Sequence, residues 1–168
     1  MIWAAMDFKN KRYYTYLSDV FKALGGAQLG YNWLVTDCEC YPSTPEYEKF
    51  DRNCRVFLTG GELTKVADTE DFQWVWAAFT GFEKGLALEE ILRYPLPKSE
   101  TDSFYLRPYT MQHPRSVIEI TAFDSSYTIF RTRYKALYDT IMASDPGMRE
   151  LGEWNRLPLE TLYPEYYK

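Results

Sequence analysis

The sequence predicts a single α+β domain, in which a mostly antiparallel sheet packs against helices from both ends of the chain. Three observations predict it. Helical periodicity occurs near each end of the chain, short runs of β-forming residues fill the middle, and a turn at 124–126 separates two such runs. The length of 168 residues suits one domain.

Two helices carry the clearest apolar spacing. The first begins at about residue 10 and its apolar positions run from Tyr13 to Leu24, after which Gly25 and Gly26 provide a left-handed stop. The second spans residues 134–142 and ends at Asp145-Pro146-Gly147. Shorter helices are expected at 62–67, capped near Thr59 or Gly60, and at 86–93, before two prolines.

Strands are predicted where β-forming residues cluster. The expected ranges are 1–6, 31–38, 56–58, 116–123 and 127–131, the last two forming a hairpin. The run 72–82 fits either a buried helix or a strand with Phe72, Trp74 and Trp76 on one face. Gly81 and the many β-favouring aromatic residues favour the strand. Residues 98–115 are expected to be a loop with a brief strand at 104–106.

The domain is expected to occupy residues 1–147. Residues 148–168 form an aromatic-rich extension that includes Trp154, Tyr163 and Tyr167. Such a segment is too apolar for a solvated linker, so we expect it to dock on the domain.

The net charge of −5 is concentrated in residues 37–71, which hold nine acidic residues against four basic ones. Nucleic acid is therefore not an expected partner, because phosphate binding needs a basic surface. No apolar run approaches the roughly 18 residues that cross a bilayer, so no membrane association is expected. The start of the chain does not resemble an export signal, and the cysteine count is odd. Both features predict a cytoplasmic protein with reduced thiols.

Few residues suit catalysis or metal binding. Cys38, Cys40 and Cys54 lack the spacing of a structural zinc site, so neither a metal nor another cofactor is expected. The only histidine, His113, precedes a proline. A catalytic site would have to combine it with acids such as Asp37 and Glu39, and the sequence does not show that the three converge.

Aromatic residues are unusually abundant, with 15 Tyr, 10 Phe and 5 Trp. Most can be assigned to the core, but Trp and Tyr also anchor protein interfaces. An acidic segment at 37–55 lies between the second and third predicted strands. The candidate binding residues are Trp33, Glu46, Glu48, Asp51, Trp74 and Trp76.

Several segments resemble a family of small uncharacterised bacterial proteins. They are YNWLVTDCECYP at 31–42, GGELT at 60–64, WAAFTGF at 76–82, EILRYPLP at 90–97 and IEITAFDSSYT at 118–128. The resemblance covers most of residues 1–145 and implies a fold but no activity, cofactor or site residue.

The leading functional hypothesis is a non-enzymatic module that binds a protein, with a basic protein as the candidate partner, as immunity and inhibitor proteins do. Complementary charge would speed and select such an encounter. The alternative is a small hydrolase or ligand-binding domain with an aromatic-lined pocket that uses Asp37, Glu39 and His113. The sequence does not indicate an oligomeric state.

Overall fold

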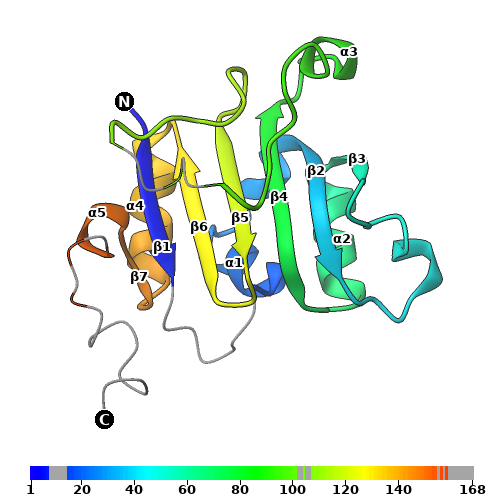
Figure 1. Ribbon diagram of the computed structural model, residues 1–168, viewed down its shortest axis with the longest axis horizontal. Helices are drawn as coiled ribbons and strands as arrows, with labels where there is room; N and C mark the ends of the chain where they lie inside the picture. The colour runs from blue at the N-terminus through cyan, green and yellow to red at the C-terminus, as the bar shows by residue number, and fades with distance from the viewer. Residues whose placement is uncertain (8–14, 102–103, 105–106, 155, 157, 159–168) are drawn as a thin grey trace.

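A computed structural model describes residues 1–7, 15–101, 104, 107–154, 156 and 158. Its centre is one antiparallel sheet of seven strands in the order β3-β2-β4-β5-β6-β1-β7 (Figure 1). The strands are β1 Trp3–Asp7, β2 Tyr31–Cys40, β3 Arg55–Thr59, β4 Trp74–Glu83, β5 Ile118–Phe123, β6 Tyr127–Thr132 and β7 Met148–Glu150. The predicted α+β class with a mostly antiparallel sheet is confirmed.

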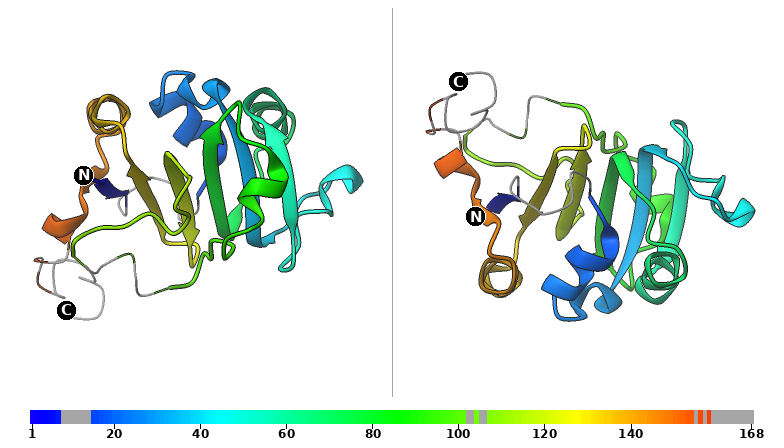
Figure 2. Two further views of the ribbon diagram at one scale, coloured as in Figure 1. Left: turned by 90° about the horizontal axis from the view of Figure 1, so that it is seen from above. Right: turned by 90° about the horizontal axis from the view of Figure 1, so that it is seen from below.

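The main helices lie on one face of this sheet (Figure 2). The α-helices are α1 Leu17–Ala23, α2 Gly60–Thr69, α3 Leu88–Ile91, α4 Lys135–Ser144 and α5 Leu151–Trp154, with 3-10 helices η1 Ala27–Gly30 and η2 Pro45–Tyr47. Helices α1, α2 and α4 cover one face, which we call the helix face. The described residues between α3 and β5 lie on the other face, which we call the loop face, and we call these residues the crossing segment.

The first helix is shorter than predicted. Helix α1 begins at Leu17, and Tyr16 before it has extended backbone angles. Thr15 forms an isolated bridge with Trp74, so this stretch pairs with the sheet instead of extending the helix. The earlier part of the predicted helix, together with most of the brief strand at 104–106, lies outside the described residues.

Two irregularities in β2 and β4 reassign side chains between the faces. The pairing of β2 with β4 shifts register between Thr36 and Glu39 and again between Glu39 and Cys40. Glu39 pairs with Trp76 while Cys40 pairs with Trp74, so Val75 is an extra residue in β4. The prediction that Trp74 and Trp76 share a face is therefore wrong, because the bulge turns Trp74 alone towards the helices.

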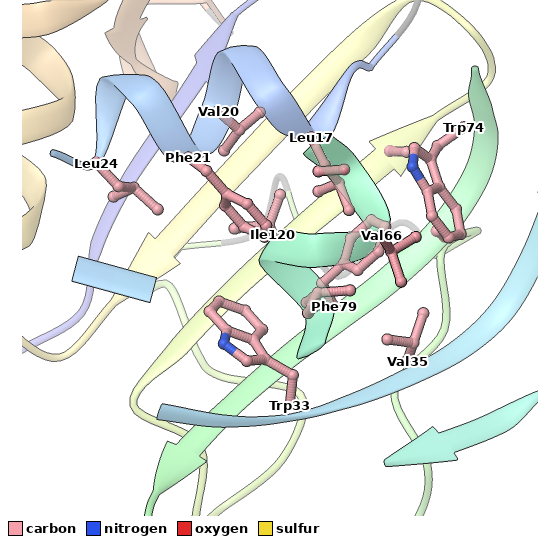
Figure 3. Close-up of a cluster of buried hydrophobic side chains, with 14 of the residues drawn as sticks. Leu17, Val20, Phe21, Leu24, Trp33, Val35, Val66, Trp74, Phe79 and Ile120 are labelled. Atoms are coloured by element: carbon pink, nitrogen blue, oxygen red, sulfur yellow. The ribbon is translucent and has the colours of Figure 1, made fainter. Parts of the chain in front are cut away.

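The main core fills the space between the sheet and the helices (Figure 3). Trp33 and Trp74 are 0% and 2% exposed, and Trp33 Nε1 donates a 3.1 Å hydrogen bond to the carbonyl of Gln28. The Trp74 ring lies 4.8 Å from Phe79 and 5.2 Å from Phe50. Other members of this core are Leu17, Val20, Phe21, Leu24, Val35, Val66 and Ile120.

Helix α2 begins where the sequence placed its cap. Thr59 Oγ1 accepts from the Glu62 amide, and the Glu62 carboxylate accepts from the Thr59 amide, which is a complete capping box. A Cβ atom at Gly60 would lie 2.2 Å from the carbonyl oxygen of Gln28. Only glycine lets α2 start this close to η1.

The chain after residue 147 continues the fold. Strand β7 pairs with β1 as an edge of the sheet, with Asp7 opposite Met148. Leu151 in α5 is buried against Ala4 and Met6 of β1. Residues 148–151 of the predicted extension are therefore part of the sheet and its packing, and most of the residues after 154 lie outside the described residues.

Candidate functional site

The connection between β2 and β3, residues 41–54, extends beyond the end of the sheet (Figure 1). We call it the β2–β3 loop. Three of its side chains, those of Tyr47, Phe50 and Cys54, are buried in the main core. The Tyr47 ring lies 6.0 Å from Phe72, and the Phe50 ring lies 5.2 Å from Trp74. The loop therefore has aromatic anchors of its own.

A carboxylate from the end of α2 fixes the first part of this loop. Glu70 accepts hydrogen bonds from the Ser43 amide at 2.6 Å, the Ser43 hydroxyl at 2.7 Å and the Thr44 amide at 2.9 Å. Hydrogen bonds from Thr44 and Ser43 lower the pKa of Glu70 to about 2 from its usual 4.5. Glu70 is ionised at neutral pH, and its charged carboxylate is occupied by hydrogen bonds from Ser43 and Thr44.

The acidic residues predicted to bind a partner lie on the surface of this loop. Glu46, Glu48 and Asp51 are exposed. Asp51 Oδ1 also accepts a 2.9 Å hydrogen bond from the Asn53 amide, which fixes the turn before Cys54. These side chains are accessible on a backbone held in place by buried groups.

The predicted tryptophans are placed differently from these acids. Trp33 and Trp74 belong to the main core, because each is almost fully buried beneath the helices. Trp76 is half-buried on the loop face, and its ring lies 4.7 Å from Phe123. The β2–β3 loop also carries Tyr41, a 70% exposed aromatic residue that was not among the predicted binding residues. Its position between the end of a strand and a proline was the one signal in the sequence that could have indicated an exposed aromatic residue.

A shallow pocket of about 360 Å³ lies against the same loop. Its lining includes Tyr41 and Phe50 together with the carboxylates of Glu39, Glu48 and Asp51. Glu39 forms an ion pair with Arg52 and accepts a 3.1 Å hydrogen bond from the Tyr41 hydroxyl. The pocket thus combines two aromatic rings with an excess of negative charge.

The residues of the alternative catalytic hypothesis have separate partners. Asp37 accepts hydrogen bonds from the amide and hydroxyl of Ser99, each at 2.8 Å. Glu39 is engaged by Arg52. His113 is 0% exposed, and its Nε2 lies 3.0 Å from the Ile91 carbonyl while its Nδ1 accepts from the Arg115 amide. No bond between any two of the three occurs within the described residues.

A buried ion pair on the loop face was not predicted. Glu119 on β5 and Arg131 on β6 are cross-strand partners, 2% and 1% exposed, with Arg131 Nη2 2.8 Å from Glu119 Oε2. The same carboxylate accepts from the amides of Gln112 and His113 and from the Ser116 hydroxyl. Arg131 lies 4.6 Å over the Phe104 ring.

This ion pair attaches the crossing segment to the sheet. Burial lowers the pKa of Arg131, and the negative charge of Glu119 opposes that shift. The donors to Glu119 come from residues 112–116, and Arg131 Nη1 donates to the carbonyl of Thr110 at 2.9 Å. We interpret the network as structural, because Glu119, Arg131, His113 and Ser116 are all buried.

The three cysteines are free thiols. Burial raises the pKa of Cys38 far above its usual value, with a hydrogen bond from Cys54 adding to the shift, and burial raises the pKa of Cys40 to about 12. The thiols of Cys38 and Cys40 are therefore protonated at neutral pH and are weak nucleophiles. Within the part of the chain that the structure describes, no group of three or more His, Cys, Asp or Glu side chains could hold a metal ion.

A larger pocket of about 890 Å³ lies at the far end of the sheet, beside the start of β1. We call it the β1 pocket. Its lining includes Trp3, Arg107, Tyr109, Arg133, Tyr138 and Glu150. It is aromatic-lined, as the alternative hypothesis expected of a ligand site, but none of Asp37, Glu39 and His113 contributes to it.

Comparisons with known proteins add no relative: no family model, curated protein or solved structure matches this chain. Among the described residues, no helix combines the length and apolar character needed to cross a membrane.

Replacing Glu70 tests whether the β2–β3 loop is held by a charged group. The folded-state pKa of Glu70 is lowered, so its contribution to stability is complete above the unfolded value near 4.5 and is lost as pH falls towards about 2. We expect Glu70→Gln to lower the urea midpoint at pH 7, and the difference from wild type to shrink between pH 4.5 and 2.

Glu48→Gln is the matched control, since it removes one exposed carboxylate from the same loop. A difference between wild type and Glu70→Gln that stays constant over this pH range would show that the hydrogen bonds to Glu70 do not stabilise its charged form.

Proposed function

We propose that this protein is a non-enzymatic binding module that presents the β2–β3 loop to a basic protein partner, as immunity and inhibitor proteins present acidic surfaces. One observation carries the proposal. Three exposed carboxylates, those of Glu46, Glu48 and Asp51, lie on a loop whose backbone is fixed by hydrogen bonds to Glu70 and by buried aromatic rings.

Preorganisation of the loop supports this function. Ordering a flexible loop on binding costs conformational entropy, and a loop that is already ordered avoids that cost. Here the ordering contacts use the buried rings of Tyr47 and Phe50 and the Glu70 carboxylate, which is occupied by Ser43 and Thr44. The exposed side chains remain available for a partner.

The exposed aromatic and acidic side chains of this region can accommodate a basic side chain of the partner. Tyr41 is a large exposed aromatic, the residue type that anchors many interfaces. Next to it, Glu39, Glu48 and Asp51 line the shallow pocket. A lysine or arginine from the partner can place its aliphatic stem on the Tyr41 ring and its charge among the carboxylates.

Charge placement also suits fast and selective association. The whole net charge of −5 equals the excess of acidic residues in 37–71, which includes this loop. An acidic patch of this kind accelerates encounter with a basic partner, and salt weakens the effect. We place the protein in the cytoplasm, where three unpaired thiols remain reduced.

The experiment compares proteins captured from host lysate by two triple variants. Glu46→Lys/Glu48→Lys/Asp51→Lys reverses the loop charges, and Glu89→Lys/Glu100→Lys/Glu153→Lys makes the same change in net charge at exposed positions elsewhere. We expect a basic protein to bind wild type and the second variant, and to be lost from the first.

Capture of the same proteins by wild type and the loop variant would refute the proposed function. A single Tyr41→Ala change tests the aromatic anchor, and its expected effect is a weakening of at least about tenfold, as for other central interface aromatics. The loop variant and Tyr41→Ala should retain the far-UV circular dichroism of wild type, since the altered side chains are exposed and the backbone bond from the Cys54 amide to the Asp51 carbonyl still closes the turn.

A further inference from the structure

The β1 pocket has the dimensions of a small-molecule site. Its volume of about 890 Å³ falls within the range of roughly 300–1,000 Å³ found for ligand pockets. It is formed by the start of β1, the residue after β6, one face of α4 and residues 107–109. It lies at the end of the sheet opposite the β2–β3 loop, so it is separate from the surface assigned to the protein partner (Figure 1).

One wall of the pocket is aromatic. The rings of Trp3 on β1 and Tyr138 on α4 are 5.5 Å apart and tilted by 37°. Tyr109 contributes a third ring, with the Arg107 guanidinium 5.2 Å from its centre. Flat apolar surfaces of this kind favour a planar ring in the ligand, through offset or edge contacts.

The two arginines of the pocket differ in their charge balance. Arg107 is neutralised by Glu150, whose Oε1 lies 3.2 Å from Arg107 Nη2. Arg133 instead donates from Nε to the Ser116 carbonyl at 2.7 Å and from Nη2 to the Pro114 carbonyl at 3.0 Å. None of the ion pairs formed within the described residues includes Arg133.

Arg133 is therefore a positioned cation with an uncompensated charge. The two carbonyl groups fix the plane of its guanidinium but carry no net charge. Guanidinium groups bind carboxylates through short, charge-assisted hydrogen bonds, and a group already held in place loses little entropy in doing so. The charged side chains of the pocket lining sum to +1, since Arg107 and Glu150 cancel.

We propose that the β1 pocket binds a small molecule that joins one aromatic ring to one carboxylate, with the ring against Trp3 and Tyr138 and the carboxylate at Arg133. A ligand with only the ring lacks the partner for the charge, and a ligand with only the carboxylate lacks the apolar contact. Recognition therefore needs both parts.

The test uses three probes on the full chain: phenylacetate, its neutral analogue phenylacetamide, and acetate. Saturation-transfer NMR and calorimetry measure binding at low millimolar concentration. We expect phenylacetate to bind at least about tenfold more tightly than either of the others, since one charge-assisted hydrogen bond accounts for a factor of that size.

Variants locate the bound probe. Arg133→Gln should weaken phenylacetate about tenfold and leave phenylacetamide unchanged, whereas Arg93→Gln, which removes an exposed arginine outside the pocket, should change neither. Trp3→Leu should weaken both aromatic probes. Because Arg133 also holds two loop carbonyls, thermal melting of each variant checks the fold, and Arg133→Lys retains the charge and should retain part of the affinity.

Three results would overturn the proposal: equal affinity for phenylacetate and phenylacetamide, unchanged phenylacetate binding in a folded Arg133→Gln protein, or no saturation transfer from either aromatic probe. None of them bears on the β2–β3 loop, so the two proposals fail independently.

Discussion

Glu119→Gln is expected to lower the free energy of unfolding by about 3–5 kcal/mol, as for other buried ion pairs that lose one partner. The substitution keeps the size of the side chain and removes its charge. Arg131, which is 1% exposed, would remain buried with the Thr110 carbonyl as its hydrogen-bond acceptor. Urea unfolding followed by circular dichroism measures the loss.

Two further variants test whether the loss of stability in Glu119→Gln comes from the buried, unpaired charge of Arg131. Glu89→Gln makes the same change at an exposed position, so it should alter stability by less than about 0.5 kcal/mol. The double variant Glu119→Gln/Arg131→Met should be less destabilised than the sum of the single variants, because the second change removes the unpaired charge. A stable Glu119→Gln protein would mean that the ion pair is not a main attachment of the crossing segment.

Trp74→Ala is expected to cost about 3–5 kcal/mol, the usual range for removing a buried aromatic ring. Its ring contacts Phe50, Phe72 and Phe79, so the cavity would open between the sheet and the base of the β2–β3 loop. Trp76→Ala removes the same side chain two residues away on the same strand. Trp76 is half-buried on the other face, so its loss should cost clearly less.

Circular dichroism is the appropriate signal for this pair, since each variant removes a fluorophore. Equal losses for Trp74→Ala and Trp76→Ala would contradict the bulge at Val75, because both rings would then contribute equally to the core.

Most of the sheet could be predicted from local patterns. Alternation in 116–123 and the turn at 124–126 located β5 and β6, and β-forming residues located β2 and β4. Helix α1 was predicted too long because apolar spacing continued through Tyr16, which instead precedes the helix with an extended backbone. A pairing between distant residues, Thr15 and Trp74, outweighed the local preference there.

The candidate sites were predictable only in part. Acidic residues in a loop are exposed by default, so Glu46, Glu48 and Asp51 followed from composition. The burial of Trp33 and Trp74 did not follow from composition, because it depends on which face of the sheet the helices cover. Asp37 adopts a positive φ of 53° at the β2 irregularity. An aspartate within a run of β-forming residues does not by itself predict such an irregularity. The ion pair between Glu119 and Arg131 depends on strand register and on a distant covering segment.

The position of β1 has a consequence for synthesis of the protein. Trp3 pairs with Thr132, and Asp7 pairs with both Thr128 and Met148. During translation this first strand leaves the ribosome long before either neighbour exists, whereas β2, β3 and β4 can associate as soon as they emerge. We expect the nascent chain to hold β1 unpaired until β6 and β7 arrive, and closure of that very long loop to be a slow, late event in folding.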